Sequence, residues 1–266
     1  LTQNQMVFRS CSIGGLTYTE DGDDAAPGDA PSTTATGHAA GMRASMLEAP
    51  RSEGRWSDLL QTVRAGGPAA AAVDDFCKII CACHTVFAEQ NTDGSISYQA
   101  ASPDEGALVK AARAIGYEFV SRGLETLVLR VDGVELTLQV LAVNEFSSER
   151  KRMSMLVRDA TGGPYMLFCK GADDVIFERL ASKSSAEGKA VESATSRHLA
   201  YFAASGLRTL VLAKAVIPDE RARAWLAKHQ KAIKSTTQRE ELLAELAESL
   251  EVGLTLVGAT AIEDRL

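Results

Sequence analysis

Apolar residues recur at helical spacing in several parts of the chain, and the sharpest case follows residue 102. Its apolar stripe has four members: Leu108, Val109, Ala112 and Ile115. Ser102 and Pro103 form a typical helix start, and Glu105 completes a capping box with Ser102. Gly116 is typical of a helix end. The pattern therefore predicts a helix between Ser102 and Gly116.

Alternating apolar and polar residues indicate that strands dominate the middle of the chain. After a first extended segment over 1–18, strands are predicted over 117–122, 126–131, 134–146, 153–158, 164–169, 207–216 and 253–259. A short amphipathic piece is expected around 56–63. Further helices are predicted from Asp74-Asp75 onward, over 172–180 and 191–204, from Pro218 onward, and over 238–250. Strand hairpins with helices grouped between them favour an α+β fold, with a mainly antiparallel β-sheet flanked by helices.

The composition changes between residues 19 and 57. From Thr19 to about Glu53 the chain is rich in Asp, Gly, Ala, Pro, Ser and Thr and shows no periodicity. Such a stretch buries too little apolar surface to offset the entropy lost on ordering. We therefore expect residues 19–57 to form a disordered insertion, and residues 66–72 to form a second linker of small residues.

Composition and charge narrow the classes of function. The 266 residues are 45% hydrophobic and 24% charged, which suffices for a sizeable core. With 28 basic and 35 acidic residues the net charge is −7, so we expect no general attraction to nucleic acid or anionic lipid. The longest apolar run, 79–88, is too short to span a membrane. The first residues do not resemble a signal peptide, and the bare ends at Leu1 and Leu266 suggest a segment of a longer protein.

Three of the five cysteines crowd around His84, a grouping that also occurs in metal sites: Cys77, Cys81 and Cys83. No second close pair of Cys or His is present to complete four ligands at zinc-finger spacing. Cys77 and Cys81 also lie one helical turn apart in an apolar pattern. We therefore expect reduced cysteines that pack as small hydrophobic residues, with no metal site.

No P-loop and no dinucleotide-binding glycine pattern occurs in the chain, so a nucleotide would need another kind of site. Phe146 ends a predicted strand and is followed by three consecutive cations, Arg150, Lys151 and Arg152. An aromatic face with nearby cations suits a purine nucleotide. The same pattern also fits a core phenylalanine beside a solvated basic turn.

Three further positions have two interpretations each. Lys170-Gly171 joins a predicted strand to a predicted helix. In one interpretation the glycine lets a ligand approach the backbone, and in the other the segment is only a strand-to-helix turn in which Asp173 is the helix N-cap. Arg208 lies in an apolar segment and is either paired or ligand-facing, or it extends from an edge strand. Glu105 could anchor an exocyclic amine or serve only in the capping box.

Taken in order, these segments resemble the nucleotide-binding domain of a P-type ATPase, and most closely that of the lipid-flipping P4 subfamily. The matching stretches follow the family's order over nearly the whole chain: LTQNQM at 1–6, CHTV at 83–86, YQAASPDE at 98–105, EFSSERKRMS at 145–154, CKGAD at 169–173, GLRTL at 206–210 and GATAIEDRL at 258–266. By this resemblance, residues 1–18 and 253–266 are hinge segments leading from and to a phosphorylation domain. Residues 58–252 then form the nucleotide-binding domain, and the 19–57 insertion matches no family pattern.

The resemblance implies that the domain binds ATP through six residues: Glu105, Phe146, Ser148, Lys151, Lys170 and Arg208. Phe146 would stack on adenine, and Glu105 would bond near its amino group. Lys170 would line the deep pocket. Ser148 and Lys151 would lie by the ribose and phosphates, and Arg208 would face the phosphate end. Asp264 and Arg265 would belong to the returning hinge.

The resemblance also implies a parent membrane pump, in which ATP phosphorylates an aspartate and a phospholipid moves to the cytosolic leaflet. Mg²⁺, the phosphorylation, actuator and transmembrane domains and an accessory subunit would belong to the intact enzyme. The acceptor aspartate would lie just before Leu1, so this cytosolic segment is expected to bind ATP without catalytic residues or Mg²⁺ ligands of its own. It is expected neither to bind nucleic acid nor to insert into the membrane, whether that is the plasma membrane, Golgi or endosome.

Two alternatives stay open at this point. The chain could be a non-catalytic interaction module whose basic turn at residues 150–152 contacts acidic partners. It could also be the nucleotide-binding domain of a cation-transporting P-type ATPase. A mere basic patch would respond to any polyphosphate, whereas an adenine pocket would depend on Phe146.

Overall fold

The computed structural model describes residues 5–20, 49–181 and 185–265. Within them, one sheet contains ten strands in the order β3-β2-β1-β12-β11-β10-β9-β8-β7-β6. The strands are β1 (Gln5–Ile13), β2 (Leu16–Thr19), β3 (Ser52–Arg55), β6 (Tyr117–Arg122), β7 (Thr126–Val131), β8 (Val134–Asn144), β9 (Arg152–Asp159), β10 (Tyr165–Gly171), β11 (Arg208–Ile217) and β12 (Thr255–Arg265). Neighbours pair antiparallel except β2 and β3, which are parallel. The prediction of an α+β fold with a mainly antiparallel sheet is confirmed.

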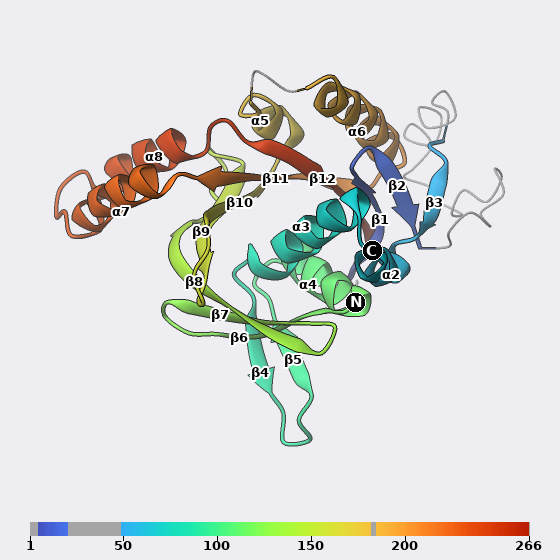
Figure 1. Cartoon of the computed structure of the whole chain (residues 1–266), viewed down its shortest axis with the longest axis horizontal. Helices are drawn as coiled ribbons and strands as arrows, with labels where there is room; N and C mark the ends of the chain where they lie inside the picture. The colour runs from blue at the N-terminus through green and yellow to red at the C-terminus, as the bar shows by residue number, and fades with distance from the viewer. Residues whose placement is uncertain (1–4, 21–48, 182–184, 266) are drawn as a thin grey trace.

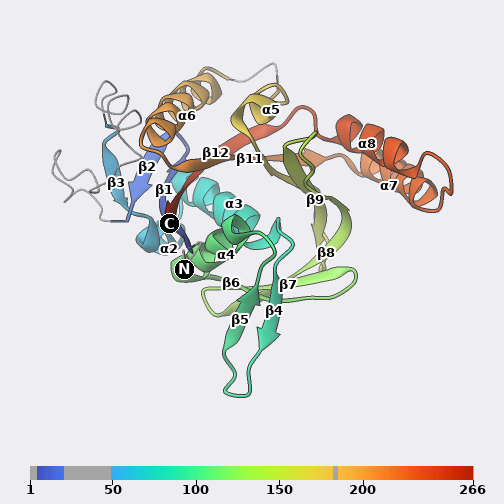
Figure 2. The same cartoon turned by 180° about the vertical axis from the view of Figure 1, so that it is seen from behind.

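The helices lie on both sides of this sheet. They are η2 (Trp56–Asp58), α2 (Leu59–Ala65), α3 (Pro68–Ala82), α4 (Pro103–Ile115), α5 (Asp173–Phe177), α6 (Ala186–Ala204), α7 (Asp219–Ile233) and α8 (Arg239–Leu250). The sheet curves around α3 and α4, whereas α5 and α6 lie on its outer side (Figure 1). Two features project from the body, the α7–α8 pair and a separate hairpin of β4 (Phe87–Gln90) and β5 (Ile96–Gln99) (Figure 2).

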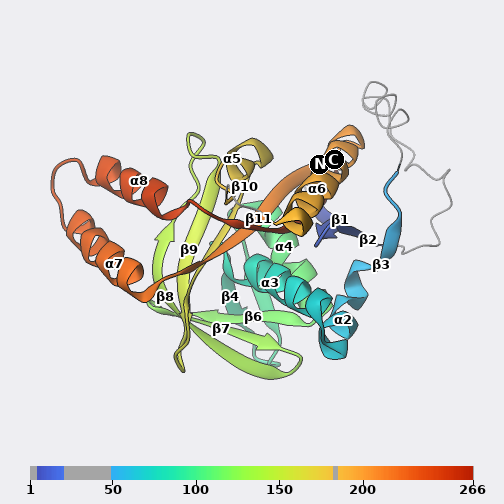
Figure 3. The same cartoon turned by 45° about the horizontal axis from the view of Figure 1, so that its top comes forward.

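The central strands are buried on both faces. In β9, Met155 and Val157 pack in the core that α3 and α4 cover, whereas Leu156 between them packs in a second core on the opposite face. The second core includes Trp225 of α7 and Leu250 of α8. Successive strand residues point to opposite faces, so a strand covered on both sides is apolar throughout. Figure 3 shows α3 and α4 on one side of this sheet, away from α5.

The helix predicted after Ser102 is confirmed with both of its caps. The Ser102 hydroxyl accepts the Glu105 N–H at 3.5 Å, and Pro103 takes the first helical position. Gly116 ends α4 with φ of 112°, a backbone conformation that favours glycine, and its N–H bonds to the carbonyl of Ala112.

The structure differs from the predicted elements in several places, and α6, for example, begins at Ala186 rather than at residue 191. Helix α3 begins at Pro68 rather than Asp74, because proline suits a first turn and the alanines at 69–72 propagate a helix. The predicted 66–72 linker is therefore mostly helical. The β4–β5 hairpin was not predicted, and β12 extends beyond 259 to Arg265. At the ends of the expected 19–57 insertion, Thr19 belongs to β2 and Ser52–Arg55 forms β3, while residues 21–48 lie outside the described residues.

The two ends of the described chain lie side by side (Figure 1). Strands β1 and β12 are neighbours in the sheet, and Gln5 pairs with Arg265 at one end of their ladder. The two segments expected to be hinges are therefore two adjacent strands.

Candidate functional site

Five of the six predicted site residues lie where neighbouring strands in the middle of the sheet begin or end. This row of strand ends is called the sheet edge below. At this edge β8 ends, β9 begins, β10 ends and β11 begins, and the register places Gly171 opposite both Arg152 and Val211. Phe146, Ser148 and Lys151 lie in the connection between β8 and β9. The neighbouring strand ends carry Lys170 and Arg208.

The sixth residue, Glu105, reaches the same edge from the first turn of α4. Its Oε1 accepts a hydrogen bond from the Lys170 ammonium at 2.8 Å, and Lys170 is only 6% exposed. Its Oε2 accepts from both the backbone N–H and the hydroxyl of Thr85, at 2.9 and 2.7 Å. Burial alone would raise the pKa of Glu105, but the Lys170 ammonium and the Thr85 hydrogen bonds outweigh it and lower the pKa. The Glu105 carboxylate is therefore ionised at neutral pH.

This arrangement corrects the capping-box interpretation of Glu105. Only the first half of the box forms, since the Ser102 hydroxyl accepts from the Glu105 N–H. The Glu105 carboxylate bonds to Lys170 and Thr85 instead. Thr85 was not singled out from the sequence, because nothing in its spacing links it to a helix that starts at residue 103.

A buried histidine and an arginine hold the turn that carries Thr85. Arg122 donates to the carbonyls of His84 and Ala82, at 2.6 and 3.0 Å. The His84 ring is 2.8 Å from the Cys81 carbonyl and accepts from the Val86 N–H at 3.1 Å. Both side chains sit behind the Glu105–Lys170 pair, and neither was predicted to matter for the site.

Phe146 presents its ring to solvent just beyond the end of β8. It is 61% exposed, which excludes the interpretation as a core phenylalanine. The turn after it is closed by a hydrogen bond of 2.8 Å from the Lys151 N–H to the Ser147 carbonyl. Lys151 has φ of 51°, and its ammonium lies 3.1 Å from a carboxylate oxygen of Asp174. Ser148 is exposed on the same turn.

The three consecutive cations after Phe146 do not form a solvated basic turn. Arg152 is 2% exposed and pairs with Glu248 and, at 2.6 Å, with Glu251. Arg150 also pairs with Glu251 and is mostly covered. Only Lys151 extends into solvent, with half of its side chain exposed. The surface that the interaction-module alternative requires is therefore largely neutralised.

Glycine is needed at position 171 for a different reason from the one expected. A Cβ at this position would lie 2.5 Å from the Cβ of Arg152 and 2.7 Å from the carbonyl oxygen of Lys151. The chain's own β9 strand thus occupies the space that a ligand was expected to take. The plain-turn alternative also fails in detail, because Ala172 rather than Asp173 is the N-cap of α5.

Arg208 extends from the first residue of β11, between α4 and the end of β12. Its guanidinium lies 2.9 Å from Asp104 and 3.5 Å from Asp264. The edge-strand interpretation is wrong, because β11 lies inside the sheet between β10 and β12. Of the two expected hinge residues, Asp264 thus contacts the site, whereas Arg265 pairs with Glu263 at 2.9 Å.

The cysteines near His84 are buried and separately engaged. Cys81 donates to the Tyr117 carbonyl and Cys83 to the Phe168 carbonyl. Burial raises the pKa of the Cys83 thiol to about 11, which keeps it protonated. Over the ranges that the structure describes, no group of three or more His, Cys, Asp or Glu side chains could hold a metal ion.

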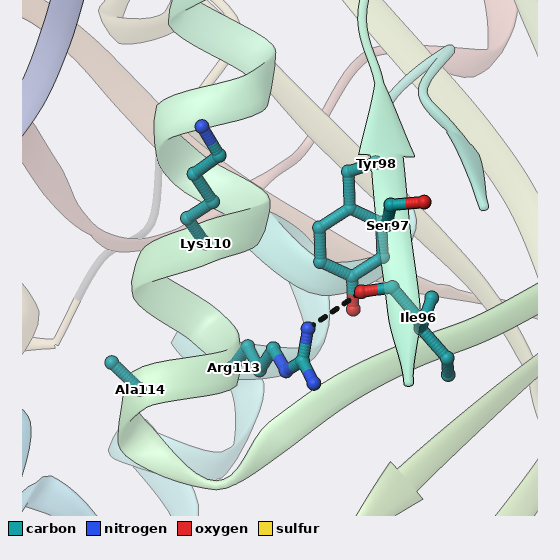
Figure 4. Close-up of a pocket in the computed structure, with 6 residues that line it drawn as sticks. All are labelled: Ile96, Ser97, Tyr98, Lys110, Arg113 and Ala114. Atoms are coloured by element: carbon teal, nitrogen blue, oxygen red, sulfur yellow. Dashed lines mark hydrogen bonds between the residues drawn. The ribbon is translucent and has the colours of Figure 1, made fainter. Parts of the chain in front are cut away.

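A separate surface pocket lies at the other end of α4 (Figure 4). It is lined by Ile96, Ser97, Tyr98, Lys110, Arg113 and Ala114. Arg113 donates to the Ile96 carbonyl at 2.8 Å and pairs with Glu118 at 3.1 Å. None of the predicted site residues lines this pocket.

No helix in the described ranges has the length and apolar character needed to cross a membrane.

Comparison with known proteins decides the family. Residues 72–266 match the family model described as "P-type ATPase, cytoplasmic domain N". The chain belongs to this family. The N domain is also 41% identical, over its whole length, to "Phospholipid-transporting ATPase IC" of Xenopus tropicalis. It is 39% identical to "Probable phospholipid-transporting ATPase IM" of Homo sapiens and 40% identical to "Phospholipid-transporting ATPase DRS2" of Saccharomyces cerevisiae, again over the whole chain.

The N domain spans only about a fifth of each of these relatives: 20%, 22% and 18% of their lengths. The family resemblance expected from the short motifs is confirmed.

Proposed function

We propose that this N domain binds ATP at the sheet edge described above and presents the γ-phosphate to an aspartate in a neighbouring domain. The observation that carries the proposal is the Glu105–Lys170 pair, a nearly buried carboxylate and ammonium 2.8 Å apart, at the same sheet edge as the exposed Phe146 ring. In a protein with a net charge of −7, Lys151 and Arg208 gather at the same edge. This combination suits a purine base followed by a polyanionic tail.

The adenine end of the ligand would meet Phe146 and Glu105. The exposed Phe146 ring offers a face on which a base can stack. Each Glu105 oxygen already accepts hydrogen bonds from the protein, and a carboxylate oxygen retains room for a further donor. An adenine amino group could supply that donor, whereas a guanine carbonyl in the same place would face the carboxylate unfavourably. The pocket is therefore expected to prefer adenine over guanine.

The phosphate end would meet cations whose present partners are weakly held. The Lys151–Asp174 pair is more than half exposed on both sides, so exchanging Asp174 for phosphate costs little. Arg208, also half exposed, could exchange Asp104 and Asp264 for phosphate in the same way. The Ser148 hydroxyl, which is exposed on the same turn, would contact the ribose or phosphates.

ATP fits this donor set, and Mg²⁺ would come with the intact enzyme. No cluster of metal-ligating side chains occurs in the described residues, so we assign Mg²⁺ to the phosphates and to a neighbouring domain. The chain alone is then expected to release negligible phosphate from ATP. Steady phosphate release in a malachite-green assay, abolished by Phe146→Ala, would contradict this expectation.

We further propose that the parent is a phospholipid-translocating pump. The similarity to phospholipid-transporting ATPases supports this parent over the cation-transporting alternative. The N domain would work with phosphorylation, actuator and transmembrane domains through the β1 and β12 hinges, and an accessory subunit would bind the parent. The interaction module is not favoured, because Arg150 and Arg152 are already paired with carboxylates.

The test is an NMR titration with ATP, ADP and GTP, with and without Mg²⁺. We expect an ATP dissociation constant of about 0.1–5 mM, since most phosphate contacts of the intact enzyme lie elsewhere. Binding should prefer adenine, depend little on Mg²⁺ and disappear in Phe146→Ala. Leu124→Ala, which removes a fully exposed apolar side chain in the turn between β6 and β7, is the matched control. Equal responses to any polyphosphate, or no response by about 10 mM, would refute the proposal.

A further inference from the structure

One buried carboxylate, Glu251, lies behind the turn that carries Phe146. Glu251 is the C-cap residue at the end of α8 and is 0% exposed. Its carboxylate accepts from the Arg152 Nε at 2.6 Å and the Ser154 hydroxyl at 2.5 Å, and it pairs with the Arg150 guanidinium. Three donors from one short segment thus converge on a single side chain from a helix about a hundred residues away.

These contacts tie together both ends of the β8–β9 connection. Asn144, the last residue of β8, donates a hydrogen bond to the Ser154 hydroxyl at 2.9 Å. The Ser154 hydroxyl in turn donates a hydrogen bond to the Glu251 carboxylate. Arg152 begins β9 and donates to the Arg150 carbonyl at 3.0 Å. The two strand ends from which the turn emerges are therefore fixed to the same carboxylate.

Arg150 carries this anchoring to the residue next to the aromatic ring. One guanidinium nitrogen contacts Glu251, and the other donates to the carbonyl of Glu145 at 2.9 Å. Glu145 immediately precedes Phe146. A continuous chain of hydrogen bonds therefore runs from the end of α8 through Arg150 to the backbone that orients the Phe146 ring.

A buried ionic network of this kind is a poor way to gain stability alone, because desolvating the charges offsets most of their attraction. Apolar residues of similar size would stabilise the same packing at least as well. What the network supplies is direction, since the planar guanidinium fixes the relative positions of the groups that it bridges. It also neutralises Arg150 and Arg152, which leaves Lys151 as the cation of this turn that faces solvent.

We infer that Glu251 is a positioning residue for adenine recognition, holding the Phe146 turn in its binding conformation through Arg150. The inference rests on the proposed function, because it concerns the same site. It also means that ATP affinity depends on the α7–α8 pair, which projects from the body of the domain (Figure 3).

The test compares two ligands in Glu251→Gln and Arg150→Met. Inorganic tripolyphosphate can use Lys151 and Arg208 but has no base to stack on Phe146. We expect the ATP dissociation constant to rise about tenfold in both variants, while that of tripolyphosphate changes less than about twofold. A purely structural defect would weaken both ligands together. Glu245→Gln, an exposed acid on the same helix, is the matched control and should change neither.

Hydrogen exchange supplies a readout that needs no ligand. Amides of 145–151 should exchange faster in both variants, while those of the β6–β7 hairpin stay as in the wild type. If Glu251→Gln does not fold because Arg150 is left without a counter-charge, Arg150→Met alone decides, since Arg152 still neutralises Glu251 there. Equal losses for both ligands, or unchanged ATP affinity and exchange, would overturn the inference. Failure of the wild type to bind ATP would instead refute the proposed function, and the exchange rates would still test the anchoring of the turn.

Discussion

Acidification should destabilise this domain through His84, the buried histidine behind the Glu105–Lys170 pair. Its Nε2 faces the Cys81 carbonyl, which can only accept, so this nitrogen carries the proton and Nδ1 accepts from the Val86 N–H. Burial, together with the positive charges of Arg122 and Lys170, lowers the pKa of His84 from 6.5 to about 3. The folded protein therefore holds this ring neutral.

The sign and size of the effect follow from linkage between protonation and folding. The unfolded chain binds a proton at His84 near pH 6.5 and the folded chain does so only near pH 3, so acid favours unfolding between these values. The stability contributed by the neutral ring is complete above pH 6.5 and is lost as the pH falls toward 3. At pH 5 the loss relative to pH 7.5 is about 2 kcal/mol, since each pKa unit corresponds to about 1.4 kcal/mol.

Urea unfolding at pH 7.5 and pH 5.0 measures this loss in the wild type and in His84→Gln. The wild type should lose about 2 kcal/mol more than the variant between the two pH values. His198 and His229, whose pKa values are also lowered by burial, remain in both proteins and cancel in the difference. Equal losses in the two proteins would show that the pKa of His84 is close to its ordinary value, and would refute the reasoning.

Three further changes test the site from different sides. Gly171→Ala should cost about 1–3 kcal/mol, because its Cβ would collide with the backbone of β9, and the urea midpoint should fall; an unchanged midpoint would show that the strand ends separate freely. Glu105→Gln should cost about 3 kcal/mol by leaving the Lys170 ammonium buried without a counter-charge, and adding Lys170→Met should recover much of it in thermal melts; no recovery would contradict the pairing. Arg208→Gln should change stability by less than about 1 kcal/mol yet weaken ATP binding in titrations without weakening adenosine binding, and a loss for both ligands would remove Arg208 from the phosphate end.

The fold could be predicted from the sequence wherever a local signal was strong. The Ser102 and Gly116 caps bracket α4 as predicted, and β7 and β8 form a hairpin close to the strands predicted over 126–131 and 134–146. The β4–β5 hairpin was missed because its strands are only four residues each and half of those residues are polar. The predicted start of helix α3 was too late because a run of small residues is typical of a linker, and only tertiary packing shows that this run is helical.

The candidate site could be predicted only in part from the sequence, because its deciding contacts are long-range. Each short motif had a structural alternative, and the contacts that decide between them join distant parts of the chain. Lys170 meets Glu105 across 65 residues, and Arg152 meets Glu251 across 99. A run of three cations predicts a solvated surface unless the carboxylates that cover two of them can be placed, and only the fold places them.

The adjacent chain ends have a mechanical consequence. Gln5 faces Arg265 at one end of the β1–β12 ladder, so a force that separates the two ends acts across this ladder rather than along it. Inter-strand hydrogen bonds loaded in this direction open one pair after another, whereas sliding one strand along the other would strain all of them together. The domain is thus compliant to being pulled apart at its ends and stiff to shear. Because Arg208 pairs with Ile262 near the loaded end of β12, peeling from this end reaches the proposed phosphate-binding arginine within the first few pairs.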